Sequence, residues 1–102
     1  MVKKINTEEF NNLTSEYVVL DLFADWCGPC KMLGPVFEEV SEEFENVEFV
    51  KVNVDSDGDV ARSFGVQSIP TLIILKNKEE ISRKIGFAPK NQLVDWIKEN
   101  TK

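Results

Sequence analysis

Two cysteines, Cys27 and Cys30, are separated by two residues and are the only cysteines of the 102-residue chain. Residues three apart on an α-helix have Cα atoms about 5 Å apart, which lies inside the separation that a disulfide needs. The two residues can therefore form a disulfide without much movement of the backbone. Thiol–disulfide exchange is the first chemistry that this spacing predicts.

The roles of the two cysteines depend on where a helix begins. If it begins at or just after Cys27, the sulfur of that residue faces the free N–H groups and the positive dipole end of the first turn, which favour a thiolate. Cys27 is therefore the predicted nucleophile. Cys30 lies inside the turn, where we expect less contact with solvent, and is the predicted resolving cysteine. Gly28 allows a tight turn, and Pro29 suits the first helical turn because its missing N–H costs little there.

Two other uses of a Cys-x-x-Cys pair are weaker. A stabilising disulfide across so short a loop constrains the unfolded chain by only about 2 kcal/mol, against about 4.7 kcal/mol for a hundred-residue loop. A zinc site needs four ligands, and the chain has no second cysteine pair and no histidine. We therefore expect no metal site.

Composition limits the class of protein. The 102 residues suit a single domain, 1–102, with one core. A net charge of −6 without a Lys/Arg cluster makes nucleic acid and anionic membranes poor partners. No stretch approaches the length of a membrane span, and no apolar run follows Lys3 and Lys4. We therefore expect a cytoplasmic protein, whose thiols a reducing compartment keeps available for redox work.

The elements around the cysteines follow from the hydrophobic pattern. Residues 17–24 are nearly all apolar, which is typical of a strand covered on both faces. Asp21 is the exception in this run, and it must either find a partner or become hard to ionise. From Cys27 a helical pattern extends to Phe44, and Pro35 inside it is expected to kink the helix. The predicted apolar face of this helix comprises Met32, Leu33, Val36, Phe37, Val40 and Phe44.

The remaining segments predict an α/β fold with the order β-α-β-α-β-α-β-β-α and helices on both faces of the sheet. The segment Asp55–Asp59 looks like a calcium loop, but no glutamate follows at the required spacing, so capping of a short helix through Phe64 is favoured. The other expected strands cover residues 2–5 (an edge), 47–54, 71–75 and 81–85, and the other helices follow Asn6 or Thr7 and begin near Pro89.

Two motifs, residues 26–31 (Trp-Cys-Gly-Pro-Cys-Lys) and 68–71 (Ser-Ile-Pro-Thr), resemble the thioredoxin family, and the likeness covers nearly the whole chain. The resemblance implies a thioredoxin fold: a central mixed five-stranded sheet flanked by four helices. In this fold the first and third strands flank the second strand and are parallel to it, and the last two strands join the sheet in antiparallel orientation. It also implies a protein disulfide reductase that needs no bound cofactor. Its partners would be a thioredoxin reductase, using a flavin fed by NADPH or ferredoxin, and disulfide-containing target proteins.

The resemblance assigns further site residues. Asp21 would take the proton of Cys30, directly or through water, and Lys51 would lie within ion-pair reach of Asp21 and tune it. A structural salt bridge between Asp21 and Lys51 is the alternative. Pro70 would be cis, and the backbone of Ile69 would bind an extended substrate segment. The implied docking patch comprises Trp26, Gly28, Pro29, Val66, Ile69, Pro70 and Gly86. For Trp26 core packing is the alternative, and for Gly86 a plain strand end.

Some residues depart from the family pattern and put the groove shape and partner preference in question. Phe23 stands where a tryptophan is common, Phe87 where a small residue is common, and the turn Asn77–Lys78 lacks a glycine. A glutaredoxin-like or isomerase-like protein is a rival, but Gly28-Pro29 resembles a reductase. A binding module with an idle redox turn is the rival from another class. We expect a monomer.

Overall fold

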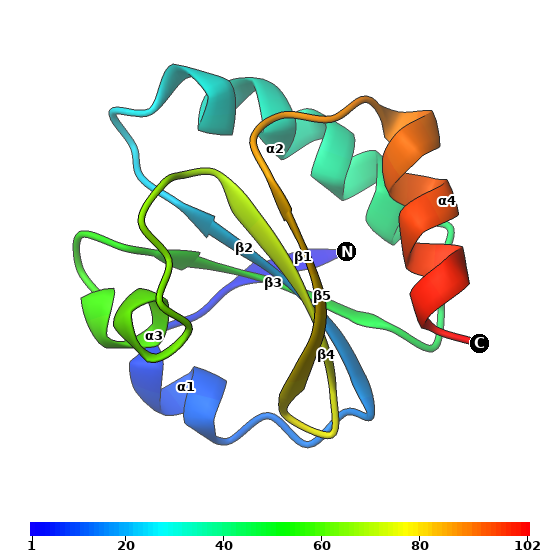
Figure 1. Cartoon of the computed structure of the whole chain (residues 1–102), viewed down its shortest axis with the longest axis horizontal. Helices are drawn as coiled ribbons and strands as arrows, with labels where there is room; N and C mark the ends of the chain where they lie inside the picture. The colour runs from blue at the N-terminus through cyan, green and yellow to red at the C-terminus, as the bar shows by residue number, and fades with distance from the viewer.

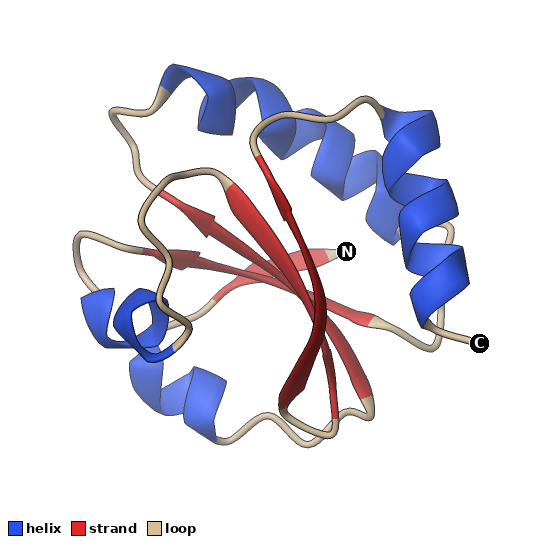
Figure 2. Ribbon diagram, viewed as in Figure 1, coloured by secondary structure: helices blue, strands red, loops and turns tan.

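Five strands form one sheet that has two helices on each face (Figure 1, Figure 2). The computed structural model describes residues 1–102. The elements follow the predicted order, with four helices and five strands. They are β1 (Val2–Lys4), α1 (Thr7–Asn11), β2 (Tyr17–Phe23), α2 (Gly28–Ser41), β3 (Glu48–Asn53), α3 (Gly58–Ser63), β4 (Thr71–Lys76), β5 (Glu79–Ile85) and α4 (Lys90–Asn100).

The sheet has the order β1-β3-β2-β4-β5. Strands β1, β3 and β2 are parallel, whereas β4 is antiparallel to β2 and β5 is antiparallel to β4. The expectation that the first strand flanks the second was wrong, because β3 lies between them. The antiparallel addition of the last two strands is confirmed. Strand β4 starts beside the end of β2, where Thr71 pairs with Leu22.

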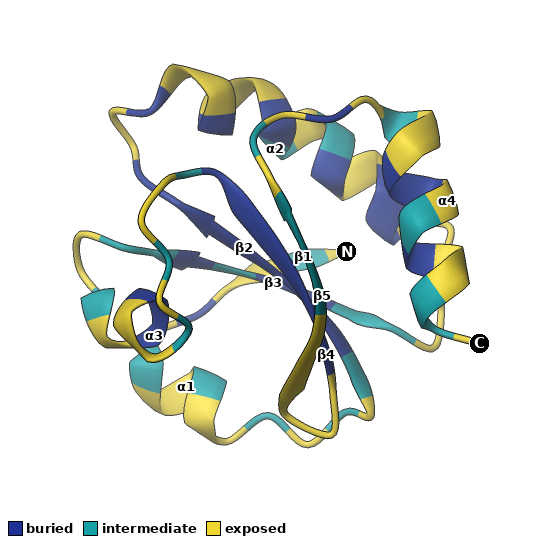
Figure 3. Cartoon of the chain, in the orientation of Figure 1, coloured by how far each residue is buried: buried dark blue, intermediate teal, exposed yellow.

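Each face of the sheet has its own core (Figure 3). On one face α2 and α4 cover the sheet, and on the other face α1 and α3 do so. Alternation along β2 decides which side chains point to which core, because successive strand residues face opposite ways. Val19 lies in the core below α2, and Leu20 lies in the core near α3. Asp21 therefore points to the α2 face.

The apolar stripe of α2 is narrower than the sequence predicts. Leu33, Phe37 and Val40 are fully buried, at the i, i+4, i+7 spacing of one helix face. Met32 was assigned to this face, but its side chain is 62% exposed. One residue corresponds to a rotation of about 100° around a helix, which carries Met32 out of the stripe. Pro35 lies inside α2, as expected, and the bend predicted there stays a prediction.

The short helices α1 and α3 are joined by two unexpected hydrogen bonds. Asn6 caps α1 in a capping box with Glu9. Asp57 occupies the N-cap position of α3, but its side chain does not cap that helix as the sequence analysis expected. Its carboxylate instead accepts hydrogen bonds from the backbone N–H and the hydroxyl of Thr7, both at 2.9 Å. Asp57 thus ties α1 to α3.

The glycine-free turn between β4 and β5 forms with two residues in the left-handed region. Asn77 has φ 50° and Lys78 has φ 73°. Asparagine tolerates this conformation, while lysine adopts it at a cost. The Lys78 ammonium donates to the carbonyl oxygen of Asn11 at 3.0 Å, which fixes the turn against the end of α1.

Candidate redox-active site

Cys27 is the N-cap residue of α2, directly after the turn that follows β2. Its backbone is extended, and its sulfur accepts a hydrogen bond from the backbone N–H of Cys30 at 3.2 Å. Cys27 and Cys30 form a disulfide with a Cα–Cα distance of 5.2 Å. The predicted start of the helix is therefore confirmed, and one first-turn N–H group, that of Cys30, is directed at the Cys27 sulfur.

The two cysteines do not differ in burial. Cys27 is 4% exposed and Cys30 is 5% exposed, so the expected difference in solvent contact is absent in the disulfide form. The reason is that the bond holds both sulfurs in one small cluster with Phe23 and Ala24. What distinguishes the sulfurs is the hydrogen bond that Cys27 accepts at the helix start.

Gly28 and Pro29 lie exposed between the cysteines. Pro29 is in the first turn of α2, where its missing N–H leaves no helical hydrogen bond unmade. A Cβ at Gly28 would meet no atom within 4 Å, and its φ is not positive. The tight turn therefore does not require glycine, contrary to the sequence argument. The space above Gly28 is open.

Asp21 is buried on β2 with 1% of its surface exposed. Its Oδ1 has no hydrogen-bond partner. Burial raises the pKa of Asp21 to about 7, although the positive charge of Lys51 lowers it. Of the two outcomes that the sequence left open, Asp21 thus follows the second: it finds no direct partner and is hard to ionise.

Lys51 lies opposite Asp21 in the parallel register of β2 and β3. The ion pair that the resemblance implied does not form, because no ammonium–carboxylate distance of 4.0 Å or less joins them. The Lys51 ammonium lies instead over the ring of Phe23, 4.3 Å from its centroid. This is a cation–π contact, in which the electron-rich ring face attracts the charge. The charge of Lys51 still acts on Asp21 through space.

Trp26 is 70% exposed, which excludes the core-packing alternative. Its indole N–H donates to the carboxylate of Asp55 at 2.9 Å. Sequence reasoning had placed Asp55 only in the segment considered for calcium or a helix cap. A lone aspartate far along the chain gives no local signal of this contact.

The loop before β4 lies against the disulfide. The Ile69–Pro70 peptide bond is cis, which confirms that expectation. The Cys27 sulfur lies 3.9 Å from the carbonyl oxygen of Ile69. Trp26, Val66 and Ile69 line one open hollow of about 180 Å³. Three of the implied docking residues are thus brought together beside Cys27.

Of the remaining implied docking residues, Pro70 lies below the surface, whereas Gly86 is partly exposed. Pro70 is buried, so its side chain cannot form part of an exposed patch as proposed from the resemblance. Its carbonyl oxygen accepts the Gly86 N–H at 2.8 Å. Gly86 has φ 88°, a conformation that favours glycine and ends β5 at this contact.

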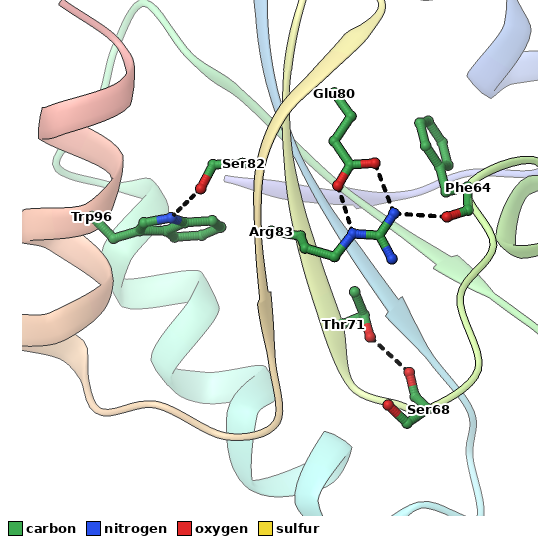
Figure 4. A network of polar contacts seen from close by, with 7 residues as sticks. All are labelled: Phe64, Ser68, Thr71, Glu80, Ser82, Arg83 and Trp96. Carbon is green, nitrogen blue, oxygen red and sulfur yellow. Dashed lines mark hydrogen bonds and ion pairs between the residues drawn. The ribbon is translucent and has the colours of Figure 1, made fainter.

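Polar contacts brace the loop that carries Val66 and Ile69 (Figure 4). The guanidinium of Arg83 on β5 donates to the Phe64 carbonyl oxygen at 2.7 Å and pairs with Glu80. At the other end of the loop, the Thr71 hydroxyl donates to the Ser68 carbonyl oxygen at 2.7 Å. Sequence reasoning missed Arg83, because a basic residue in an exposed strand has no distinguishing pattern.

The described residues contain no group of three or more His, Cys, Asp or Glu side chains that could hold a metal ion. No helix is long and apolar enough to cross a membrane.

Comparisons with known proteins agree with this arrangement. The sequence model of the family described as Thioredoxin matches residues 1–99. The thioredoxin of Chlamydia caviae is 42% identical, over 99% of this chain and all of that protein, and the thioredoxin of Bacillus subtilis is 43% identical over 94% of each. Among solved structures, a single-site mutant of the thioredoxin from Halobacterium salinarum superposes with a TM-score of 0.91 at 31% identity, covering 99% of this chain and 91% of that one. The Malassezia sympodialis thioredoxin gives 0.87 at 35% identity, covering 100% and 92%.

Proposed function

Because the chain belongs to the thioredoxin family and is a thiol–disulfide oxidoreductase, we propose that a thioredoxin reductase supplies its electrons and that disulfide-containing target proteins receive them. The Cys27/Cys30 pair cycles between a dithiol and the intramolecular disulfide that the structure contains. No bound cofactor takes part in this proposal, because both electrons reside on the two sulfurs.

One observation carries the assignment of the nucleophile: the Cys27 sulfur sits at the N-cap of α2 and accepts the N–H of Cys30. A thiolate at this place gains from the hydrogen bond and from the positive end of the helix dipole. The sulfur also borders the Ile69 carbonyl, at the edge of the hollow where a partner would dock. Charge stabilisation and contact with the Ile69 loop therefore coincide at Cys27.

In the proposed reaction, the Cys27 thiolate attacks one sulfur of a target disulfide and the other target sulfur leaves as a thiolate. The Cys30 thiol then loses its proton and attacks the Cys27 sulfur. The second target sulfur leaves, and the Cys27–Cys30 disulfide forms. Two electrons pass to the target, whose two thiolates take up protons from water, while the Cys30 proton passes to its acceptor. The reductase then restores the dithiol.

Asp21 is the proposed proton acceptor for Cys30, acting directly or through water. It lies on the face of β2 that α2 covers, and burial raises its pKa to about 7. A carboxyl group with that value can both accept and return a proton near neutral pH. Lys51 tunes it through its positive charge.

The proposed docking surface consists of Trp26, Val66 and Ile69 with the exposed residues Gly28 and Pro29. An extended target segment would lie along the Ile69 backbone, and the open space above Gly28 would admit it. Gly86, which is partly exposed, belongs to this proposed surface as well, and the buried Pro70 supports it by accepting the Gly86 N–H.

We further propose that the protein works as a monomer in the cytoplasm. A Cys-x-x-Cys pair in a reducing compartment serves exchange rather than stability, which supports this location. The acidic surface, with a net charge of −6, supports protein partners over nucleic acid or anionic membranes.

An insulin reduction assay with dithiothreitol tests the activity, and trapping tests the roles. Cys30→Ser should accumulate mixed disulfides with target proteins through Cys27, whereas the matched Cys27→Ser variant should trap almost none. Non-reducing gels and mass spectrometry measure both. Equal yields from the two variants would contradict the two-step mechanism. Partner binding that survives replacement of both cysteines by serine would favour the binding module instead.

A further inference from the structure

Lys51 has two possible partners on the same face of β2. Asp21 lies directly opposite it in the register, and Phe23 lies two residues farther along the strand, so both side chains point the same way. A carboxylate is ordinarily the stronger partner for an ammonium group. The ammonium nevertheless lies over the Phe23 ring, and Oδ1 of Asp21 has no partner.

The position over the ring brings Lys51 toward the redox turn. Lys51 and Phe23 line a hollow of about 210 Å³ together with Cys30, and this hollow is separate from the one that Trp26 lines. They also line a neighbouring hollow of about 330 Å³. The charged residues of the two hollows are Lys4 from β1, Asp25 from the redox turn, Lys31 and Glu38 from α2, and Lys51 from β3.

We infer that Phe23 is a positioning residue, whose ring holds the Lys51 ammonium in the hollow that reaches Cys30 and apart from the Asp21 carboxylate. This inference rests on the proposed function in one respect: the position of Lys51 matters for catalysis only if Asp21 exchanges a proton with Cys30. In this arrangement the lysine charge faces the space around the resolving sulfur. It forms no ion pair with the Asp21 carboxyl group and acts on it only through space. Burial raises the pKa of Asp21 to about 7, and the Lys51 charge in its present position lowers it only in part.

The inference predicts what happens when the ring is removed. In Phe23→Leu the ammonium loses its ring contact and can approach Asp21, and an opposite charge within about 4–6 Å lowers a carboxyl pKa by 1–3 units. We expect the titration midpoint of the Asp21 carboxyl carbon, followed by 13C NMR in the oxidised protein, to fall by about one pH unit. Phe23→Trp keeps an aromatic face and should keep the midpoint of the unchanged protein.

A double-mutant cycle separates this effect from simple hydration. If the ring acts through Lys51, Phe23→Leu should leave the Asp21 midpoint unchanged in a Lys51→Met background. If the ring only excludes water, the midpoint falls equally in both backgrounds, and the inference is overturned. An unchanged midpoint in Phe23→Leu with Lys51 present overturns it as well.

Two further measurements keep the test decisive. Should Phe23→Leu not fold, Phe23→Met removes the ring with an unbranched side chain. In the unchanged protein, the ring current of Phe23 should shift the ε-methylene protons of Lys51 upfield, and ordinary shifts for these protons would overturn the inference without any variant. If the midpoint shifts as expected while the reduction rate stays the same, the positioning by Phe23 is supported and the proposed proton transfer by Asp21 is contradicted.

Discussion

Two aspartates show how differently this fold treats a carboxylate. Asp57, at the joint between α1 and α3, accepts two hydrogen bonds from Thr7 and one from Ser56, and these bonds lower its pKa. Asp21, between β2 and α2, has an oxygen without any partner, and burial raises its pKa to about 7. Asp57 is therefore fully supplied with hydrogen-bond donors, whereas Asp21, in the interior next to the redox turn, is not.

Under the proposed function, this difference separates a structural carboxylate, Asp57, from a functional one, Asp21. A partnered carboxylate stabilises the fold in the charged form, whereas an unpartnered buried carboxylate opposes folding once it is charged. A protein keeps a residue with this unfavourable folding energy where its function requires that residue. Sites that exchange protons are typical examples. The same substitution, aspartate to asparagine, should therefore have opposite effects at the two positions.

Asp21→Asn should give the largest effect. The shift from 3.8 to about 7 corresponds to about 4 kcal/mol that opposes folding when Asp21 is charged. Since a buried amide also lacks partners, we expect a net gain of roughly 2–4 kcal/mol at pH 8 by denaturant unfolding. Single-turnover reduction of a target should slow by about 100-fold, because Cys30 loses its proton acceptor. A variant that is less stable and equally fast would make Asp21 purely architectural.

The pH dependence of stability sharpens the contrast. For Asp21 the folded-state pKa is above the unfolded value, so its contribution is fully present below about pH 4 and is lost as pH rises to about 7. Over this window its slope approaches 1.36 kcal/mol per pH unit, roughly the energy of one pKa unit. Unfolding of the unchanged protein and of Asp21→Asn at several pH values should show that this loss disappears in the variant. Parallel curves would contradict the raised pKa.

Asp57→Asn should destabilise the protein at neutral pH. The folded-state pKa of Asp57 is lowered, so its contribution is present above the unfolded value and is lost as pH falls through the folded one. The melting temperature of the variant should therefore be lower at pH 7 and approach that of the unchanged protein in acid. The insulin reduction rate should stay unchanged, because Asp57 touches no part of the redox site. A loss of activity in the folded variant would contradict the assignment of Asp57 as a purely structural carboxylate.

Asp55→Ala should have the smallest effect. The variant removes the acceptor of the Trp26 indole N–H, and an exposed hydrogen bond contributes about 1 kcal/mol or less. Trp26 should become more mobile, with a lower fluorescence anisotropy, and KM for a protein target should rise by a few fold at unchanged stability. An unchanged KM would mean that the orientation of Trp26 does not matter for docking.

Local patterns predicted the helices and strands well, because the residues that each element buries recur in the sequence at the spacing of that element. The spacing of Leu33, Phe37 and Val40 marked α2, and the uninterrupted apolar run marked β2. The position of β1 was not predictable in the same way. Its three residues pair with β3 across nearly fifty positions of the chain, and nothing in Val2–Lys4 specifies that neighbour.

The same distinction between local patterns and distant contacts applies to the candidate site. The redox pair and the helix start follow from six adjacent residues, and the resemblance supplied the cis Pro70. Register places Lys51 opposite Asp21, but the direction of a long side chain depends on competing partners, and here the Phe23 ring prevails. The equal burial of the cysteines was also missed, because a disulfide draws both sulfurs into one environment.

The antiparallel direction of β4 has a consequence for biosynthesis. Translation delivers β2 and both cysteines long before Thr71, whose strand covers the free edge of β2 and carries the loop with Ile69 to the sulfurs. A nascent chain that ends before residue 71 therefore has the thiols without the Ile69 loop held against them, and β2 still presents an open edge. During synthesis the cysteine pair is therefore present before the loop that lies against it, and this loop reaches the sulfurs only when β4 is in place.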